Sequence, residues 1–337
     1  MGSKTIAPFM STKCHAHTDE TDICRWTTVG KEALDNESNG FGVVMMGGGE
    51  GSRLGCKGPK GLFVVDRKTN LFDVHMEKLK QLKGRVKALI YLFFMTSAFT
   101  REKTEDFVKE FFGTRKVTDY CTDYEIIVQG NMPILDLEGN TIGDFNSPNG
   151  NGGVYIPLRE AAHFSKCQYF NLFSVDNIAA TFFEESILGC MIDQKYDVLN
   201  QAVNPNKGEK VGAFTFRDDQ SVVIEEYDPS SGMVDTKDVM GNICNHMLTG
   251  EFIKSIDVSK MEIHKAEKSP KEGMEGHSKI VKQELFVFDC FDQSNRVGVY
   301  CVDRETHFVP LKSEADVKPM KTWFLNSGIF SNKLLED

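Results

Sequence analysis

The chain has 337 residues, of which 40% are hydrophobic and 26% are charged, which is typical of a globular protein with a large buried core. Lysine and arginine number 39 and aspartate and glutamate 49, so the formal net charge is -10. An acidic surface repels a phosphate polymer, and we therefore expect no nucleic-acid partner. Any anionic ligand must be held by a few placed cations and backbone amides.

The sequence also argues against a membrane protein. Its longest strongly apolar run, residues 88–99, is well short of the roughly 20 residues of a spanning helix. The nine cysteines include no CxxC pair and are typical of reduced thiols, so we expect a cytoplasmic protein. A zinc cluster of Cys14, His15, His17 and Cys24 is the alternative for the first of them, but this spacing matches no standard zinc site.

Residues 1–40 are polar and show little periodicity, which predicts an arm with room for a short helix. The first buried strand is expected at residues 41–46, where an apolar run ends in three glycines. Apolar residues then recur at helical spacing and predict a helix over residues 72–82. A second strand at 89–95 and a helix from the N-cap Thr100 to residue 113 follow.

Two more apolar runs, at 124–128 and 169–175, flank a loop rich in Asn, Gly and Pro at 146–153. Strands that alternate with helices predict an α/β fold, with a Rossmann-like, mixed but mainly parallel sheet covered by helices on both faces. Ligands of such sheets bind at the carboxyl ends of the strands.

The second half of the chain is less regular. A hairpin is predicted at 211–216 and 221–227, and further strands at 285–288 and 297–302. Residues 265–282 are rich in Gly, Lys and Glu and predict a loop.

The most informative segment is the glycine-rich loop Gly47-Gly-Gly-Glu-Gly-Ser-Arg-Leu-Gly55, followed by Pro59-Lys60-Gly61. Glycines directly after a strand let backbone amides approach phosphate oxygens closely. The loop fits neither a Walker A motif nor GxGxxG. Arg53 and Lys60 add two cations, which suit a triphosphate. The alternative is a flexible turn whose charges are solvated.

This loop resembles the GGxGTRLG…PKG signature of the UDP-sugar pyrophosphorylases. Further segments match the family in order, and each is weak alone but specific together. They are Phe94-Met-Thr-Ser97, Gln129-Gly-Asn-Met-Pro133, Pro148-Asn-Gly-Asn-Gly-Gly153, Ser174-Val-Asp-Asn177, Gly241-Asn-Ile-Cys-Asn-His246, Leu285-Phe-Val-Phe-Asp289 and Pro310-Leu-Lys312. The resemblance implies a GT-A-like nucleotidyltransferase core at 41–255, preceded by the arm at 1–40. Residues 256–337 would complete the site.

Within the family, the chain is most similar to enzymes that use N-acetylglucosamine-1-phosphate. Members that make UDP-glucose carry a His-containing loop where this chain has residues 149–153. The resemblance implies transfer of uridylyl from UTP to N-acetylglucosamine-1-phosphate with release of pyrophosphate, and Mg2+ as the cofactor. Two alternatives stay open: a UDP-glucose or UDP-galactose pyrophosphorylase of broad specificity, and a nucleotide-sugar-binding protein without catalysis.

The resemblance also implies roles for particular residues. Catalytic roles are expected for Arg53, Lys60 and Lys282. Nucleotide contacts are expected from Met46, Gly47, Gly48, Gly49, Gln129, Gly150 and Asp176, with Asp176 also the magnesium ligand. Contacts to the sugar phosphate are expected from Asn151, Gly212, Glu225, Asn242, Phe286, Phe288 and Lys312.

Several of these residues have an ordinary structural interpretation as well. Gln129 would often be a surface residue, and Asp176 could cap a helix that begins at Asn177. The two phenylalanines, expected on one face of a strand, could simply be core residues. The family commonly has Glu-Tyr where this chain has Glu225-Glu226-Tyr227, so the carboxylate could be shifted by one residue.

The termini bear on the oligomeric state. Only residues 1–40 precede the first strand and residues 313–337 follow the last motif, whereas larger family members carry accessory regions at both ends. We therefore expect a monomer.

Overall fold

The structure is a computed structural model that describes residues 14–15, 19–51, 54–56, 58–206, 209, 211–216, 222–226, 240–270, 272–274 and 276–330. A ten-stranded sheet forms its centre, with β1-β16-β10-β13-β9-β2-β5-β6 as the order of neighbouring strands and β11 and β12 beside β13. Its strands are β1 (Cys14–His15), β2 (Gly40–Met46), β5 (Leu89–Thr96), β6 (Asp123–Val128), β9 (Tyr169–Ser174), β10 (Val198–Val203), β11 (Gly212–Phe216), β12 (Val222–Glu226), β13 (Gly241–Thr249) and β16 (Val297–Cys301).

Two smaller sheets and the helices complete the described fold. A four-stranded sheet has the order β14-β15-β7-β8 and a two-stranded one pairs β3 with β4. These strands are β3 (Val64–Asp66), β4 (Thr69–Asn70), β7 (Asn131–Leu135), β8 (Thr141–Pro148), β14 (His264–Lys268) and β15 (Ile280–Glu284). The helices are α1 (Glu20–Asp35), α2 (Leu71–Arg85), α3 (Arg101–Gly113), α4 (Tyr155–Glu160), α5 (Glu185–Asp193), α6 (Gly250–Ser255), α7 (Arg304–His307) and α8 (Val317–Asn326).

The predicted fold class is confirmed. The strands β9, β2, β5 and β6 are parallel neighbours, as are β10, β16 and β1. β13 runs antiparallel between these two groups, so the sheet is mixed but mainly parallel.

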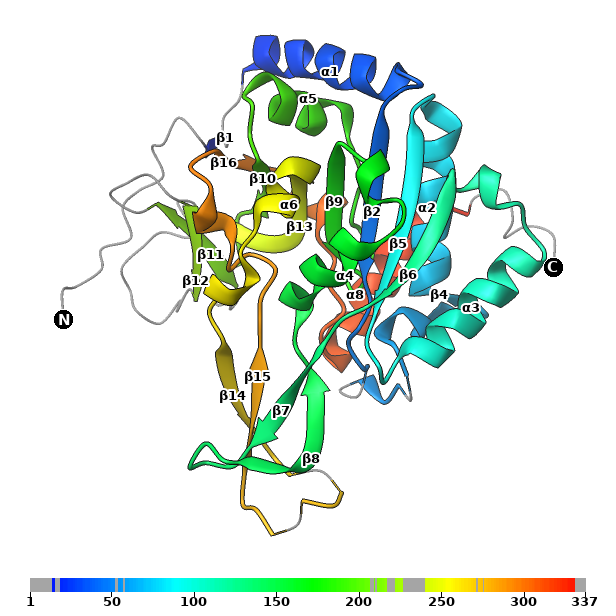
Figure 1. The fold of residues 1–337 in the computed structure, drawn as a ribbon. Helices are drawn as coiled ribbons and strands as arrows, with labels where there is room; N and C mark the ends of the chain where they lie inside the picture. Colours follow the sequence, from blue (N-terminus) through cyan, green and yellow to red (C-terminus); the bar gives the residue numbers. More distant parts are fainter. Residues whose placement is uncertain are drawn as a thin grey trace.

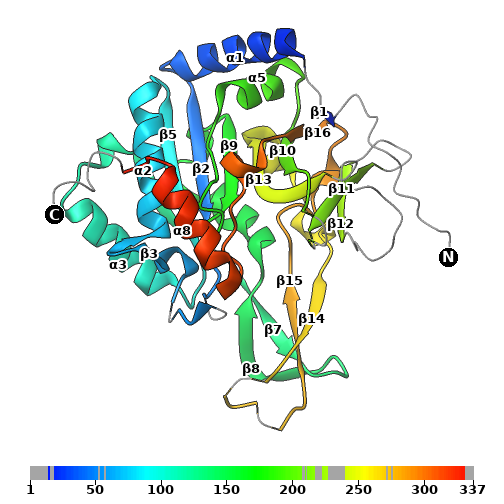
Figure 2. The same cartoon turned by 180° about the vertical axis from the view of Figure 1, so that it is seen from behind.

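Alternation of side chains along β2 explains why both faces of the sheet are covered. Phe41, Val43 and Met45 face a core shared with α1, α2, α3 and α5. Val44 and Met46 face a second core shared with α4 and α6. All five are buried, since an apolar run in a central strand must be covered on both sides. Figures 1 and 2 show these helices on opposite sides of the sheet.

The predicted strands at 41–46, 89–95, 124–128, 169–175 and 297–302 and the predicted helix at 72–82 are confirmed to within a few residues. The hairpin is confirmed as the antiparallel pair β11 and β12. Thr100 stands at the N-cap of α3, but its hydroxyl makes no cap hydrogen bond. That hydroxyl instead accepts from the Ser97 amide at 3.1 Å, because the preceding turn folds back on it.

In the second half of the chain, one prediction is wrong and another is right only in part. Residues 285–288 form no strand, and β15 ends at Glu284 before a turn. The Leu285 amide donates to Asn149 and its carbonyl accepts from Gly152, so the backbone bonds that would pair a strand hold a loop instead. Residues 265–268 and 280–282 belong to the antiparallel pair β14 and β15, so the predicted loop is confirmed only for the described residues between these strands.

The N-terminal segment contains the 16-residue helix α1, which is longer than a short helix in an arm. α1 lies along α5 (Figure 1), and glycine lets the two backbones approach. A Cβ on Gly30 would lie 1.8 Å from the Glu185 carbonyl oxygen, and one on Gly189 would lie 1.7 Å from that of Trp26. The domain boundaries at residues 40 and 255 stay a prediction.

The alternative of a zinc cluster near the N-terminus has no support within the described ranges. His15 Nε2 lies 3.0 Å from the Tyr196 hydroxyl, and Cys24 is exposed. His17 lies outside the described residues. Among those that are described, no three His, Cys, Asp or Glu side chains form a group that could hold a metal ion. Nor does any described helix combine the length and apolar content needed to cross a bilayer.

The four-stranded sheet projects from one end of the main sheet (Figure 1). It is called the arm from here on and is distinct from the N-terminal segment at residues 1–40. The chain passes from the main sheet into this smaller sheet directly after β6, and the first strand of the smaller sheet, β7, begins at Asn131. A small core of Ile134, Ile142, Met274 and Ile280 holds its strands together.

Candidate active site

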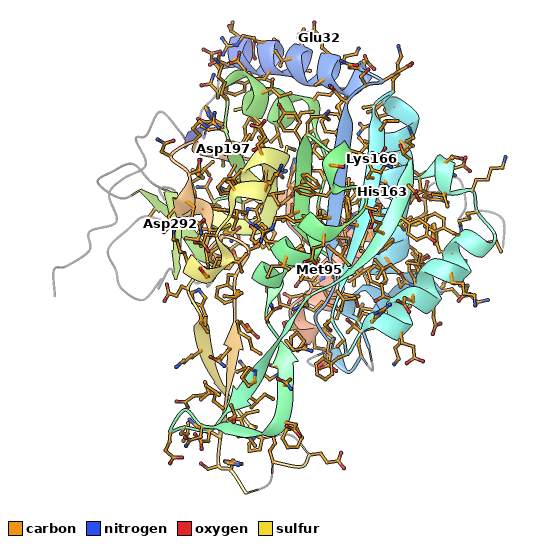
Figure 3. All side chains as sticks on the ribbon, in the orientation of Figure 1. Glu32, Met95, His163, Lys166, Asp197 and Asp292 are labelled. Carbon is orange, nitrogen blue, oxygen red and sulfur yellow. The ribbon has the colours of Figure 1, made fainter. Side chains whose placement is uncertain are left out.

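A cleft of about 710 Å³ lies where the parallel strands end and the arm begins. Met95, near the end of β5, lies at this end of the sheet (Figure 3). The cleft therefore opens where ligands of parallel sheets bind. Its walls are formed by Met46, Gly48, Gly49, Glu50, Gly51, Leu54, Lys60, Met95, Gln129, Ser147, Pro148, Gly150, Asn151, Ser174, Val175, Asp176, Lys268, Lys282, Glu284, Phe286 and Lys312.

The glycine-rich loop forms one wall of the cleft and is folded back on itself. The Lys60 amide donates to the Gly49 carbonyl at 3.1 Å, and the Gly51 amide donates to the Gly58 carbonyl at 3.1 Å. The Gly47 amide donates to the Met95 carbonyl, so it belongs to the sheet rather than to the cleft. Among the described residues, the amides of Gly48 and Gly49 have no acceptor and are available to a ligand. Arg53 lies outside the described residues.

Lys60 and Asp176 form an ion pair inside the cleft. Lys60 Nζ donates to Asp176 Oδ2 at 2.9 Å, and the Ser174 hydroxyl donates to Oδ1 at 2.7 Å. The side chains of Lys60 and Asp176 are 22% and 16% exposed. No helix begins at Asn177, whose backbone instead bridges to Pro310, so the interpretation of Asp176 as a helix cap is wrong.

The segment that carries Lys312 runs beside Asp176 and is tied to it. The Leu311 amide donates to the Asp176 carbonyl at 2.8 Å. The buried Asn177 amide group donates to the His307 carbonyl at 2.7 Å and accepts from the Val309 amide at 2.9 Å. These bonds explain how two segments far apart in sequence reach one cleft.

Gln129 is 5% exposed and lines the cleft, so the interpretation as a surface residue is wrong. Its Nε2 donates to the Gly150 carbonyl at 3.0 Å, which fixes the side-chain amide. A Cβ on Gly48 would lie 2.0 Å from Gln129 Oε1, so glycine at position 48 makes room for this side chain. Gly150 has φ of +83°, a conformation that favours glycine.

Asn151 connects the cleft with β13. Its Oδ1 accepts from the Val287 amide at 2.9 Å, and its Nδ2 lies 3.6 Å from Cys244 Sγ. Cys244 has φ of +53°, which is strained for a residue with a side chain. Burial raises the pKa of its thiol to about 12, so the thiol stays protonated at neutral pH.

The other residues predicted to contact the sugar do not all line the cleft. Phe286 lines the cleft and Phe288 packs beside it, with ring centroids 5.3 Å apart. Gly212 lies near Asn242, since a Cβ on Gly212 would be 3.8 Å from that of Asn242, and neither lines the cleft. In the β11–β12 pair, Glu226 stands opposite Gly212 and Glu225 opposite the next residue. The side chain of Glu225 lies outside the described part of the structure.

The cleft concentrates positive charge on an acidic protein. Lysines 60, 268, 282 and 312 line it against Glu50, Asp176 and Glu284, in a chain whose net charge is -10. Lys268, Glu50 and Glu284 were not predicted. Lys268 could have been found only by treating residues 264–268 as a strand, where it shares a face with His264 and Ala266.

These features define a class of protein. A glycine-rich loop, paired lysine and aspartate, and lysines on two further segments surround a cleft at the carboxyl ends of parallel strands, which is the arrangement of an α/β nucleotidyltransferase. A family model described as "UTP--glucose-1-phosphate uridylyltransferase" matches residues 10–332. The chain belongs to this family.

Relatives and solved structures agree with this assignment. A "Probable UDP-N-acetylglucosamine pyrophosphorylase" of Encephalitozoon cuniculi is 32% identical over 87% of the chain and 86% of the relative. The "UDP-N-acetylglucosamine pyrophosphorylase" of Saccharomyces cerevisiae is 30% identical over 80% of the chain, but the chain spans only 64% of that relative. In fold, the chain is similar to a solved structure described as "Crystal structure of putative UDP-N-acetylglucosamine pyrophosphorylase from Entamoeba histolytica". The TM-score is 0.77 at 20% identity, covering 97% of the chain and 89% of that structure.

Proposed function

We propose that this protein transfers the uridylyl group of UTP to N-acetylglucosamine-1-phosphate and releases pyrophosphate. One observation carries the proposal: the two glycine amides and the Lys60–Asp176 pair share a lysine-lined cleft at the carboxyl ends of the strands. The names of the Encephalitozoon and yeast relatives support the choice of acetylated sugar.

The reaction is an in-line attack of a sugar-phosphate oxygen on the α-phosphorus of UTP, with the bond to pyrophosphate breaking. The attacking phosphate is already ionised at neutral pH, so the protein needs no general base. Its residues must bring two anions together and offset their repulsion. We assign this role to Lys60, Lys282 and Lys312, all in the cleft, and to Arg53 on the same loop as Lys60.

The two substrates occupy different sides of the cleft in this proposal. The amides of Gly48 and Gly49 contact the triphosphate of UTP, and the Gln129 side-chain amide pairs with the imide edge of uracil. Asn151 and Phe286 contact the sugar phosphate. Gly212, Glu225 and Asn242 are assigned to the sugar by resemblance.

Magnesium is the proposed cofactor, with Asp176 as its protein ligand. Mg2+ in phosphate-transfer sites binds one or two carboxylates and completes its shell with waters and substrate phosphates. The Asp176 carboxylate fits this requirement, because it lines the cleft beside the Ser174 hydroxyl. When bound, the ion would neutralise phosphate charge during the transfer.

The second candidate is a pyrophosphorylase of broad sugar specificity. It is favoured by the stretch Gly55-Cys-Lys-Gly-Pro-Lys60, which resembles the UDP-glucose enzymes more closely, and by the glucose substrate in the family's description.

One assay separates these functions. The protein is incubated with UTP, Mg2+ and, in turn, the 1-phosphates of N-acetylglucosamine, glucose and galactose, and released pyrophosphate is measured. We expect a clear preference for N-acetylglucosamine-1-phosphate. Equal rates would favour the broad enzyme, and UTP binding without pyrophosphate release under any divalent metal would favour a binding protein. Arg53→Ala is a second test of the same site. This variant should lower turnover by orders of magnitude while the protein stays folded.

A further inference from the structure

A compact side-chain unit stands at the base of the arm, next to the cleft. His264, the first residue of β14, places Nε2 3.0 Å from Asp289 Oδ1. The other oxygen of Asp289 accepts from the Phe286 amide at 2.6 Å. The imidazole also stacks on the Phe286 ring, with centroids 4.3 Å apart and planes 28° apart. One carboxylate therefore binds both the ring that supports Phe286 and the backbone of Phe286.

The Asp289 carboxylate is buried, so its stability depends on these hydrogen bonds. The Asp289 side chain is only 5% exposed, and burial raises the pKa of its carboxyl group, while the bonds from the Phe286 amide and from His264 act against that rise. A buried carboxylate needs such partners. Without the His264 contact, the Asp289 carboxylate would be held less firmly, and Phe286, which is bonded to it, would be free to move.

Among the described residues that line the cleft, Phe286 is the one aromatic residue. The turn that carries it is docked on the loop that carries Asn151, because the Val287 amide donates to Asn151 Oδ1. Its ring thus lies on the Asn151 side of the cleft, where the proposed function places the sugar phosphate.

We propose that His264 and Asp289 are positioning residues that hold the Phe286 ring as a wall for the acceptor sugar, and so determine its discrimination between an acetamido and a hydroxyl substituent. The inference rests on the proposed function. A fixed ring packs against the acetamido methyl group, which a hydroxyl lacks, and one methyl contact in a rigid pocket discriminates by about tenfold or more. A ring that is free to move loses this preference.

The test compares the full chain with its variants His264→Ala, His264→Gln and Asp289→Asn. For each protein, kcat and KM are measured for N-acetylglucosamine-1-phosphate, glucose-1-phosphate and UTP. We expect His264→Ala to raise the KM for the acetylated sugar about tenfold and to lower the preference over glucose-1-phosphate by a similar factor, with the KM for UTP unchanged. His264→Gln, which keeps a donor toward Asp289 but not the stacked ring, should fall between His264→Ala and the parent.

Lys265→Ala is the control, because Lys265 is exposed, follows His264 on β14 and does not line the cleft. It should behave as the parent does. Thermal melting shows which variants are folded, and His264→Gln keeps the test valid should Asp289→Asn not fold. An unchanged sugar preference in folded His264→Ala, or an equal rise in KM for UTP, would overturn the positioning role alone. A parent protein that makes no UDP-N-acetylglucosamine would overturn the proposed function as well.

Discussion

Two adjacent glycines of the loop give a sharp test of phosphate binding by backbone amides. A Cβ on Gly48 would lie 2.0 Å from Gln129 Oε1 and 3.0 Å from its Cδ, whereas a Cβ on Gly49 would meet nothing within 4 Å. Gly48→Ala therefore forces Gln129 to move, while Gly49→Ala adds a methyl group beside open space in the cleft. The two variants make the same chemical change one residue apart.

The expected effects differ in kind. Overpacking at Gly48 should cost about 1–3 kcal/mol in the free energy of unfolding. At about 2.1 cal/mol/K per residue, this corresponds to a fall in Tm of roughly 1.5–4 °C for a chain of this length. Gly49→Ala should leave Tm within about 1 °C, since a change outside the packed interior alters stability by about 0.5 kcal/mol or less.

Gly49→Ala should instead weaken UTP binding. A methyl group in the phosphate path that displaces one charge-assisted hydrogen bond costs about 1.5–3 kcal/mol, or a rise of about ten- to a hundredfold in the KM for UTP. The assay is pyrophosphate release at saturating sugar phosphate, with Tm measured by calorimetry on the same samples. A folded Gly49→Ala protein with the parent's KM for UTP would refute the idea that this loop wraps the triphosphate.

Three further predictions concern charge, packing and pH. Lys60→Ala should lower kcat/KM by about 10²–10³ in the same assay, because it removes a fixed cation at the phosphates, and a smaller loss would count against its catalytic role. Gly189→Ala should lower Tm by roughly 4 °C or more, since a backbone carbonyl of α1 lies 1.7 Å from the new Cβ, whereas Gly84→Ala in α2, with nothing within 4 Å, should leave Tm equal or higher. Burial lowers the pKa of His307, but the hydrogen bond to Glu184, the charge of Glu184 and the contacts with Asp303 together outweigh this effect and raise the pKa above 6.5. The resulting stability is present below pH 6.5 and is lost as pH rises through the raised value, so His307→Asn should flatten the fall of Tm over that window, and a parallel pH profile would contradict this.

The parts of the fold that could be predicted are those in which one residue pattern decides the structure. Runs such as 89–95 are apolar on both faces, and only a central strand buries both. The same kind of pattern gives a wrong prediction at residues 285–288. The alternating phenylalanines there are typical of a strand, but the Leu285 backbone forms its hydrogen bonds with the loop at 149–153. Such a competing partner is invisible in the local sequence.

The length of helix α1 and the presence of strand β14 were missed for different physical reasons. α1 buries only Trp26, Gly30 and Leu34 among its 16 residues, and its contact with α5 also depends on close backbone approach at Gly30 and Gly189. β14 consists of His-Lys-Ala-Glu-Lys and buries little, so neither propensity nor alternation of apolar residues marks it. Lys268 could not be predicted as a cleft residue without that strand.

Several cleft residues could be predicted one by one, but the way in which they assemble could not. Gly48, Gln129 and Asp176 meet because the strands that precede them are parallel neighbours, and a parallel sheet brings its carboxyl ends to one edge. Lys312 reaches the same edge by another route, since it does not directly follow a strand of the main sheet. Its approach depends on the buried Asn177, whose amide group bonds to both the His307 carbonyl and the Val309 amide. Aspartate at position 177 would keep the acceptor and lose the donor. The spacing between Asp176 and Lys312 therefore depends on the Asn177 side-chain amide, and the sequence motif gives no sign of this role.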